Sequence, residues 1–355
     1  MRGTMADTFS SQIFSAAVYY FSMETARHLC YNSMAAHHIE IGETMKEILF
    51  LEPVFKETIW GGSRLGTEWL YDIPSDHTGE CWAISAHPHG DCIIKNGQYS
   101  GRHLSWLWEN HREYFHNLPG PIFPLLIKII DAREDLSIQV HPDNAYAYTH
   151  EHGALGKNEC WYVLNCKRDG EIVYGHNART KEELKAFIEK QDWNHLIRTL
   201  PIKPGDFLQI SPGTVHAIKA GTVLLEVQQP SDITYRLYDY GRLQNGVPRE
   251  LHISKAIDVI HCPHRDEIIE TYGQAQMGDL QIIPLISSKN YTVRRIRCRH
   301  QASLNQCFSF LAASVIKGNG TVDGIPIRQG SHFILPYNYG KYTYTGNLTV
   351  IEAYL

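Results

Sequence analysis

Two short segments, Leu136-Ser-Ile-Gln-Val-His-Pro-Asp143 and Gly156-Lys-Asn-Glu-Cys-Trp161, carry most of the information in this chain. The first segment alternates in the manner of a β-strand, and alternation places Gln139 and His141 on the same side of that strand. A carboxylate, Glu159, follows on the second segment. Nitrogen and oxygen donors on neighbouring rigid strands are the main parts of a divalent metal site. We therefore expect a metal centre between these segments.

A later segment, Gly205-Asp-Phe-Leu-Gln-Ile-Ser-Pro-Gly-Thr-Val-His216, supplies a further candidate ligand in His216, shortly after a Pro-Gly turn. His87-Pro-His89 is a competing site, because two histidines separated by one residue can share one face of a strand. Asp91 is the carboxylate nearest to them in the sequence. A histidine-containing turn is the simpler interpretation of this pair.

These segments resemble the two metal-bearing motifs of cupins and, more narrowly, the type I phosphomannose isomerases. The chain lacks the long helical insertion of the fungal members and is similar to the short bacterial form. The resemblance runs from about Met45 to Leu355. Its motifs occur in the family's order: Trp60-Gly-Gly62, Gly79-Glu-Cys-Trp82, Phe123-Pro-Leu-Leu-Ile-Lys128, Gln139-Val-His-Pro142, Gly156-Lys-Asn-Glu159 and Gln228-Gln-Pro-Ser-Asp-Ile-Thr-Tyr-Arg236.

The resemblance implies a mainly β fold, a bicupin of two jelly-roll barrels, with a few helices inserted in the N-terminal half. We expect a catalytic, metal-binding cupin domain over residues 45–265. A cupin-like β domain without metal would follow over residues 266–355, because Gly340 stands near the position of the metal histidine. Residues 1–44 are expected to be an extension outside the fold. Their apolar run, residues 13–21, leaves a targeting segment as the alternative.

The resemblance further implies one zinc ion, held by His141, Glu159 and His216. Gln139 matches a fourth ligand of the fungal members. Imidazole nitrogen and carboxylate oxygen suit zinc, and a set of few protein ligands leaves positions open for substrate. The three-ligand set is also compatible with iron.

For the chemistry, the resemblance implies a zinc-dependent isomerase that interconverts mannose 6-phosphate and fructose 6-phosphate through an enediol. Arg236 matches the family's catalytic arginine, and Glu226 has the spacing of its general base. A phosphate meets cationic and hydroxyl donors in proteins. Lys157 and Ser137 match the positions that contact it, and each lies two residues before a metal ligand, on the same face of its strand.

Two other functions are compatible with the same residues. The first is a metal-containing cupin that binds or senses a sugar phosphate without converting it. Retention of Arg236 argues against a purely binding role. The second is an iron-dependent cupin oxygenase, which Lys157 and Arg236 disfavour because both suit a phosphorylated substrate.

Composition restricts the partners. The chain has 355 residues, 43% of them hydrophobic, and a formal net charge of −5, so a broad basic surface for nucleic acid is not expected. No apolar stretch is long enough to cross a bilayer. Eight scattered cysteines without a Cys-x-x-Cys pair favour reduced thiols in the cytoplasm. The resemblance to the phosphomannose isomerases implies a small sugar phosphate as the partner.

Local patterns predict the elements around the site. The segment from Met45 to Asn96 and the last part, residues 281–355, have the short apolar runs and glycine turns of β structure. Periodicity and capping predict helices over residues 102–115, from Lys181 onward and over 254–260. Buried or alternating runs predict strands over residues 123–132, 136–141, 159–166 and 202–227, and residues 144–156 are expected to form a loop.

Overall fold

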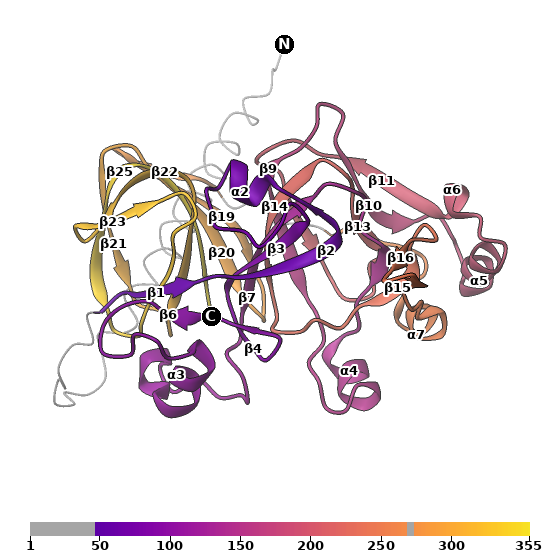
Figure 1. Cartoon of the computed structure of the whole chain (residues 1–355), viewed down its shortest axis with the longest axis horizontal. Helices are drawn as coiled ribbons and strands as arrows, with labels where there is room; N and C mark the ends of the chain where they lie inside the picture. The colour runs from indigo at the N-terminus through magenta and orange to yellow at the C-terminus, as the bar shows by residue number, and fades with distance from the viewer. Residues whose placement is uncertain (1–46, 268–272) are drawn as a thin grey trace, which may run out of the picture. The chain divides into compact units, whose positions relative to one another are not determined.

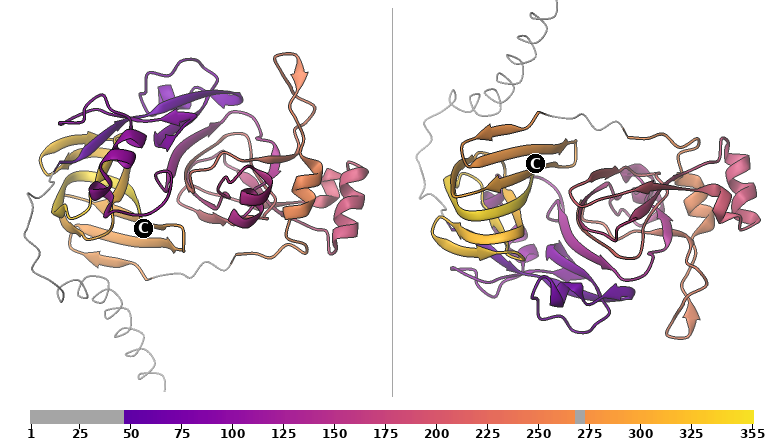
Figure 2. Two further views of the ribbon diagram at one scale, coloured as in Figure 1. Left: turned by 90° about the horizontal axis from the view of Figure 1, so that it is seen from below. Right: turned by 90° about the horizontal axis from the view of Figure 1, so that it is seen from above.

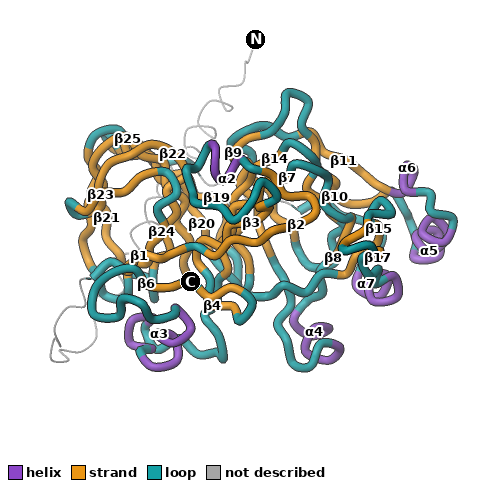
Figure 3. The backbone as a smooth tube through the Cα atoms, in the orientation of Figure 1, coloured by secondary structure: helices purple, strands orange, loops and turns teal. Residues whose placement is uncertain are grey.

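The computed structural model describes residues 47–267 and 273–355, and the expected extension, residues 1–44, lies outside them. Strands make up the body of the described chain, and helices lie at its periphery (Figure 3). No helix in these two ranges is long and apolar enough to cross a membrane. The mainly β fold is thereby confirmed.

Two sheets contain most of the strands from β2 to β15. One sheet has six strands in the order β12-β9-β14-β7-β2-β3 and the other has five in the order β11-β10-β13-β8-β15. The six-stranded sheet contains β2 (Val54–Gly62), β3 (Thr78–Ile84), β7 (Leu126–Ala132), β9 (Glu159–Asn165), β12 (Phe207–Ile210) and β14 (Thr222–Gln228). The five-stranded sheet contains β8 (Ile138–Val140), β10 (Glu171–His176), β11 (Ile197–Pro201), β13 (His216–Ile218) and β15 (Tyr235–Tyr238).

The central strands β7 and β14 are buried along their whole length. Their sequences, Leu-Ile-Lys-Ile-Ile-Asp-Ala and Thr-Val-Leu-Leu-Glu-Val-Gln, are rich in branched apolar residues that favour pleated, covered positions. Each strand nevertheless carries a charge in its interior, Lys128 on β7 and Glu226 on β14. A charge within a covered strand is unusual, since charged side chains are almost never fully buried unless they are paired.

A third sheet contains the C-terminal strands (Figure 1). Its main order is β18-β19-β20-β25-β22-β24-β1-β6, with β21 and β23 on side branches. The strands are β1 (Leu49–Glu52), β6 (Ile93–Ile94), β18 (Ala275–Met277), β19 (Leu280–Ser287), β20 (Thr292–Cys298), β21 (Gln301–Gln306), β22 (Leu311–Val322), β23 (Ile325–Arg328), β24 (His332–Leu335) and β25 (Gly340–Tyr354). The first described strand thus belongs to this sheet, because Leu49 pairs with Ile334.

Two small hairpins and short helices complete the described chain. The hairpins are β4–β5 (Ala86–His87 and Gly90–Asp91) and β16–β17 (Leu243–Gln244 and Val247–Pro248), and the second one projects from the body in Figure 2. The helices are α2 (Arg64–Thr67), α3 (Leu104–Asn110), the 3-10 helix η1 (Arg112–Phe115), α4 (Asn144–His150), α5 (Lys181–Glu189), α6 (Trp193–Leu196) and α7 (Ile253–Val259).

The predicted loop over residues 144–156 is wrong in its first half, which forms α4. Its N-cap is Asp143, whose side chain accepts a hydrogen bond from the backbone N–H of Tyr146 at 2.8 Å. Ala147 is the one buried residue of this helix, so the segment has no apolar periodicity to reveal it. In contrast, the helix start at Thr180 is confirmed, since its side chain accepts from the N–H of Glu183 at the start of α5. The Glu183 carboxylate accepts from the N–H of Arg179, and not from that of Thr180 as in a full capping box.

The C-terminal sheet buries an imidazole. His332 on β24 contacts the Ser314 hydroxyl through Nδ1 at 2.9 Å and the Tyr71 hydroxyl through Nε2 at 2.7 Å. Burial lowers the pKa of His332 from an ordinary 6.5 to about 3. The folded state therefore keeps this ring neutral at pH values where the unfolded chain binds a proton.

We predict that His332→Gln makes the protein less sensitive to acid. In the wild type, His332 binds a proton below about pH 6.5 in the unfolded chain but only below about pH 3 in the folded chain. The free energy of unfolding therefore falls as the pH is lowered through this window. Between pH 7 and pH 5 the loss from this residue is about 2 kcal/mol. Urea unfolding of His332→Gln at the two pH values should show a loss smaller by this amount. His300→Gln, at an exposed position, is the control and should behave as the wild type.

Candidate metal centre and active site

The site lies between the six-stranded and five-stranded sheets, and strand register builds it. On the six-stranded sheet Glu226 pairs with Lys128 of β7 on one side and with Trp161 of β9 on the other. On the five-stranded sheet Gln139 pairs with His216 of β13 and with Arg236 of β15. Directly paired residues project to the same face of a sheet. Each sheet therefore presents a row of polar side chains to the space between them.

Three side chains from the two sheets converge on one point. The Nε2 atoms of His141 and His216 are 3.2 Å apart, and they lie 3.6 Å and 3.5 Å from the oxygens of Glu159. Ligands at about 2.0–2.1 Å from a tetrahedral zinc ion are about 3.3 Å from one another. The three donors thus have the mutual spacing that such an ion requires.

Hydrogen bonds at the far side of each ring fix the direction of these donors. His141 Nδ1 lies 2.8 Å from the carbonyl oxygen of Ile233, and His216 Nδ1 lies 2.9 Å from that of Thr214. Each Nδ1–H donates to a carbonyl, so each Nε2 presents its lone pair to the shared point. Metal-binding histidines are oriented in this way by their surroundings.

The protonation states also suit a metal. Burial lowers the pKa of His216 to about 4, and burial together with the nearby Lys157 holds the pKa of His141 well below its ordinary value. Both rings are neutral at physiological pH, as a ligand must be. Burial and the neighbouring Glu226 raise the pKa of Glu159.

Glu159 is fully buried, and within residues 47–267 and 273–355 the ammonium of Lys157 is the one donor that reaches its oxygens. The ammonium of Lys157 lies 2.6 Å from one of these oxygens as an ion pair and 3.2 Å from His141 Nε2. A buried carboxylate with unused lone pairs is costly unless a cation satisfies it. The residues present therefore fit a metal ion, which would share Glu159 with Lys157.

Gln139, the expected fourth ligand, lies beside the three others. Its amide nitrogen is 3.3 Å from His216 Nε2, and its amide oxygen accepts from the Ser137 hydroxyl at 3.3 Å. Amide oxygen and nitrogen exchange places by a simple flip. With its oxygen toward Ser137, Gln139 turns its amide nitrogen to the metal point, and a flip of the amide, in which the Ser137 hydroxyl would accept instead of donate, would present the oxygen to a metal.

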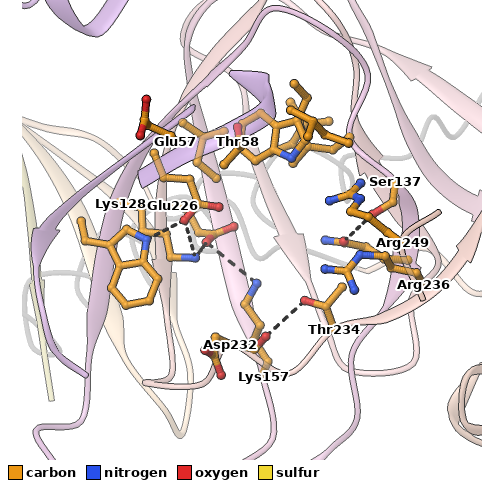
Figure 4. Close-up of a pocket in the computed structure, with 18 of the residues that line it drawn as sticks. Glu57, Thr58, Lys128, Ser137, Lys157, Glu226, Asp232, Thr234, Arg236 and Arg249 are labelled. Carbon is orange, nitrogen blue, oxygen red and sulfur yellow. Dashed lines mark hydrogen bonds and ion pairs between the residues drawn. The ribbon is translucent and has the colours of Figure 1, made fainter. Parts of the chain in front are cut away.

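A cavity of about 290 Å³ adjoins the metal point. Its lining includes all four expected polar residues, Ser137, Lys157, Glu226 and Arg236 (Figure 4). It also includes Asp232, an unranked polar candidate from the sequence, and polar residues to which the sequence had assigned no role, among them Thr58, Glu80, Lys128, Thr234 and Arg249.

Glu226 and Lys128 form the charged centre of one wall. Glu226 Oε2 accepts from the indole N–H of Trp161 at 3.0 Å, while Oε1 lies 3.4 Å from the ammonium of Lys128 and 3.9 Å from that of Lys157. Burial acts to raise the pKa of Glu226, but Lys157 and Lys128 outweigh it and hold the pKa below its ordinary value. Glu226 is consequently an ionised carboxylate whose Oε1 accepts no hydrogen bond from the described residues.

The other end of the cavity is rich in guanidinium groups. Arg236 is half-buried, and its Nε has no hydrogen-bond acceptor among the described residues. Arg249 binds Asp239 with Nε at 2.7 Å from Oδ2, and Arg242 shares the same carboxylate. Burial and the nearby Arg249 lower the pKa of Arg236. Two guanidinium groups without a matching second carboxylate make this end of the cavity suited to an anion.

Comparison with known proteins identifies the family of this chain. The model of the catalytic domain of type I phosphomannose isomerase matches residues 48–167, and that of the mannose-6-phosphate isomerase cupin domain matches residues 281–355. The mannose-6-phosphate isomerase ManA of Bacillus subtilis is 48% identical over 314 residues, which cover 87% of this chain and 99% of that protein. The chain belongs to the type I phosphomannose isomerases.

Two further relatives support this family assignment. The probable mannose-6-phosphate isomerase GmuF of the same organism is 48% identical over 85% of this chain and 97% of its own. The crystal structure of the Bacillus subtilis mannose 6-phosphate isomerase superposes with a TM-score of 0.85 at 46% identity, over 87% of this chain and 99% of that one. The cupin architecture expected from the sequence is thus confirmed for this phosphomannose isomerase.

We predict that His216→Ala removes tightly bound metal, because the substitution deletes one of three converging donors. Elemental analysis of the purified, dialysed variant should show at least about a tenfold lower metal content than the wild type. Chelation should lower the melting temperature of the wild type and leave that of His216→Ala unchanged, since only a bound ion can stabilise the fold. His103→Ala, at an exposed histidine, should keep its metal. Equal metal content in the two variants would contradict the assignment.

Proposed function

We propose that this phosphomannose isomerase interconverts mannose 6-phosphate and fructose 6-phosphate by moving a proton between C1 and C2. Family membership supports the reaction, and the observation that carries the proposal is the buried, ionised carboxylate of Glu226 in the wall of a cavity beside a buried metal-binding set. Non-catalytic sugar-phosphate binding would not require an ionised carboxylate in the cavity wall next to two ammonium groups.

We propose one zinc ion as the cofactor, held by His141, Glu159 and His216, with Gln139 as a fourth ligand. The support is the spacing of the three donors and their neutral imidazoles. When bound, zinc would act as a Lewis acid toward the sugar's carbonyl and hydroxyl oxygens. The remaining steps belong to the side chains of the cavity.

Glu226 is proposed as the general base. In the forward direction its Oε1 would take the proton from C2 of the open-chain aldose and return it to C1. The proton of the C2 hydroxyl would pass to the C1 oxygen, so that the carbonyl moves from C1 to C2. Negative charge develops on the sugar oxygens between these transfers. Lys128 and Lys157, which lie within 4 Å of Glu226, and Arg236 would stabilise that charge.

We propose that the phosphate binds at the guanidinium-rich end, contacted by Ser137 and Arg249. In Figure 4 Ser137 lies beside Arg236 and Arg249, whereas the ammonium of Lys157 points toward Glu226. Lys157, expected from the sequence to share the phosphate, is better placed for the sugar oxygens because it is paired with Glu159. Arg236 would then bridge the two ends of the substrate.

The domain division is likewise a proposal. We place the catalytic, metal-binding cupin in residues 45–265 and the cupin-like domain without metal in residues 266–355. Both clusters of metal-capable side chains in the described ranges lie in the first of these. We also propose a cytoplasmic location with no nucleic-acid or membrane partner, supported by buried free thiols such as Cys81, Cys92 and Cys160 and by the net charge of −5.

We predict that Glu226→Gln lowers kcat by about 10²- to 10⁴-fold, the range for loss of a general base. Fructose 6-phosphate formation from mannose 6-phosphate can be followed by coupling to a dehydrogenase. Glu57→Gln is the matched control, because Glu57 is an exposed carboxylate at the edge of the same cavity. Substrate binding without turnover in the wild type would favour the sensor function instead. Loss of activity in both variants alike would remove the specific role of Glu226.

We predict that Arg249→Met raises KM for mannose 6-phosphate by about 10- to 100-fold, since a charged hydrogen bond to phosphate contributes about 1.5–3 kcal/mol. The change in kcat should be much smaller. Arg242→Met is a sharp control, because Arg242 shares Asp239 with Arg249 and does not line the cavity. Equal effects of the two substitutions would show that Arg249 acts only through Asp239.

A further inference from the structure

A second cluster of metal-capable side chains lies at the edge of the cavity. His87 and His89 flank the tip of the β4–β5 hairpin, and Asp232 lies on the segment that joins β14 to β15. Asp232 is far from both histidines in the sequence, yet its two oxygens are divided between them. One oxygen lies 3.7 Å from His87 Nε2 and the other 2.5 Å from His89 Nδ1.

The carboxylate nearest in sequence is not part of this cluster. Asp91 Oδ1 accepts from the backbone N–H of Ser105 at 3.2 Å, and its Oδ2 lies 3.7 Å from His103. Asp91 is therefore held by a different segment of the chain. The carboxylate beside His87 and His89 is therefore that of Asp232, and not that of Asp91 as their closeness in the sequence had suggested.

The hairpin fixes the direction of one donor. The backbone N–H of His89 donates to His87 Nδ1 at 3.2 Å, so Nε2 is the free nitrogen of His87 and it faces Asp232. The His87 ring also packs edge-on against Trp82, with centroids 5.5 Å apart. A ring held by a hydrogen bond at one nitrogen and by packing on its side is oriented in the way expected of a metal ligand.

The separations bracket those of a coordinated ion. Ligands of a tetrahedral zinc ion lie about 3.3 Å apart, between the 2.5 Å and 3.7 Å found here. The side chain of His89 is 71% exposed and can rotate, so its Nδ1 can move from 2.5 Å toward this spacing, and one ligand atom of each residue already lies within 4.8 Å of the others. Two imidazoles and a carboxylate favour borderline divalent cations such as zinc over calcium or magnesium.

We propose that His87, His89 and Asp232 form a second, exchangeable divalent-cation site of the zinc class at the mouth of the cavity. Three protein ligands leave positions open to water or to an anionic oxygen, and Asp232 itself lines the cavity. The site binds more weakly than the buried one for two reasons. His89 and Asp232 are exposed to water, and Lys56 is nearby, with its ammonium donating to the carbonyl of His89 and lying 5.1 Å from the Trp82 ring.

The test is equilibrium dialysis of the full chain against a series of free zinc concentrations, followed by elemental analysis. His89→Ala and Asp232→Asn should each bind one ion per chain fewer than the wild type at saturation, and the loss should fall in the weaker class. His216→Ala should lose the tighter ion and keep the weaker one. Because His89 is exposed, its truncation should not disturb folding, which circular dichroism would verify.

His195→Ala is the matched control. His195 is an exposed histidine paired with Asp192 at 2.7 Å, without a second histidine in the cluster, so its removal should leave the zinc count unchanged. Binding by histidines elsewhere in the chain is common to all variants and cancels in the comparison. If His89→Ala and Asp232→Asn take up as much zinc as the wild type, the site does not exist. This outcome is independent of isomerase activity, because the measurement counts ions only.

Discussion

The register between strands is the constraint on which this site depends. Glu226 faces the cavity only because it pairs with Lys128 and Trp161, and Gln139 faces it only because it pairs with His216 and Arg236. A slip of one residue in either sheet would turn one whole row away, since the side-chain period of a strand is two. The apolar residues between these positions would then enter the cavity. The buried faces of β7 and β14 make such a slip costly, so the hydrophobic pattern that specifies the fold also aligns the polar rows.

Charge balance explains why the cavity can hold both a cation and an anionic substrate. Three carboxylates, Glu80, Glu159 and Glu226, alternate with two ammonium groups, Lys128 and Lys157, along a continuous chain of contacts. Without a metal the carboxylates are in excess. A divalent cation would reverse the excess, so that a negatively charged sugar meets a positive wall. Coulomb interactions in a buried site are much stronger than in water, so this reversal matters for binding and for the enediolate alike.

The sequence predicted those parts of the site that lie within recognisable strand patterns. Gln139, His141, Glu159 and His216 could be grouped because alternation and motif order determine their side of the strand. Lys128 offered a usable signal, a lone charge in a dense apolar run, but its significance depends on its pairing with Glu226, which is remote in the sequence. Arg249 reaches the cavity from the segment after a projecting hairpin, and no periodicity reports where such a segment folds. Helix α4 was not predicted for a related reason: a short helix with a single buried residue has no apolar periodicity, and its N-cap is the only sequence signal that remains.

Burial of a charge does not by itself mark a functional residue in this protein, as the C-terminal sheet shows. Glu352 is as fully buried as Glu159, yet its Oε1 accepts from the hydroxyls of Tyr342 and Tyr344 at 2.9 Å and 3.0 Å. Its Oε2 accepts from the guanidinium of Arg294 at 2.6 Å. Both oxygens of Glu352 thus accept hydrogen bonds from neighbouring side chains, so this carboxylate stabilises its surroundings and has no remaining capacity for a ligand. Glu159 has the same burial and the same side chain, but its oxygens are held by an ammonium ion pair alone. A buried carboxylate is structural here when hydrogen-bond donors satisfy both of its oxygens, as in Glu352, and it can bind a ligand when they do not, as in Glu159.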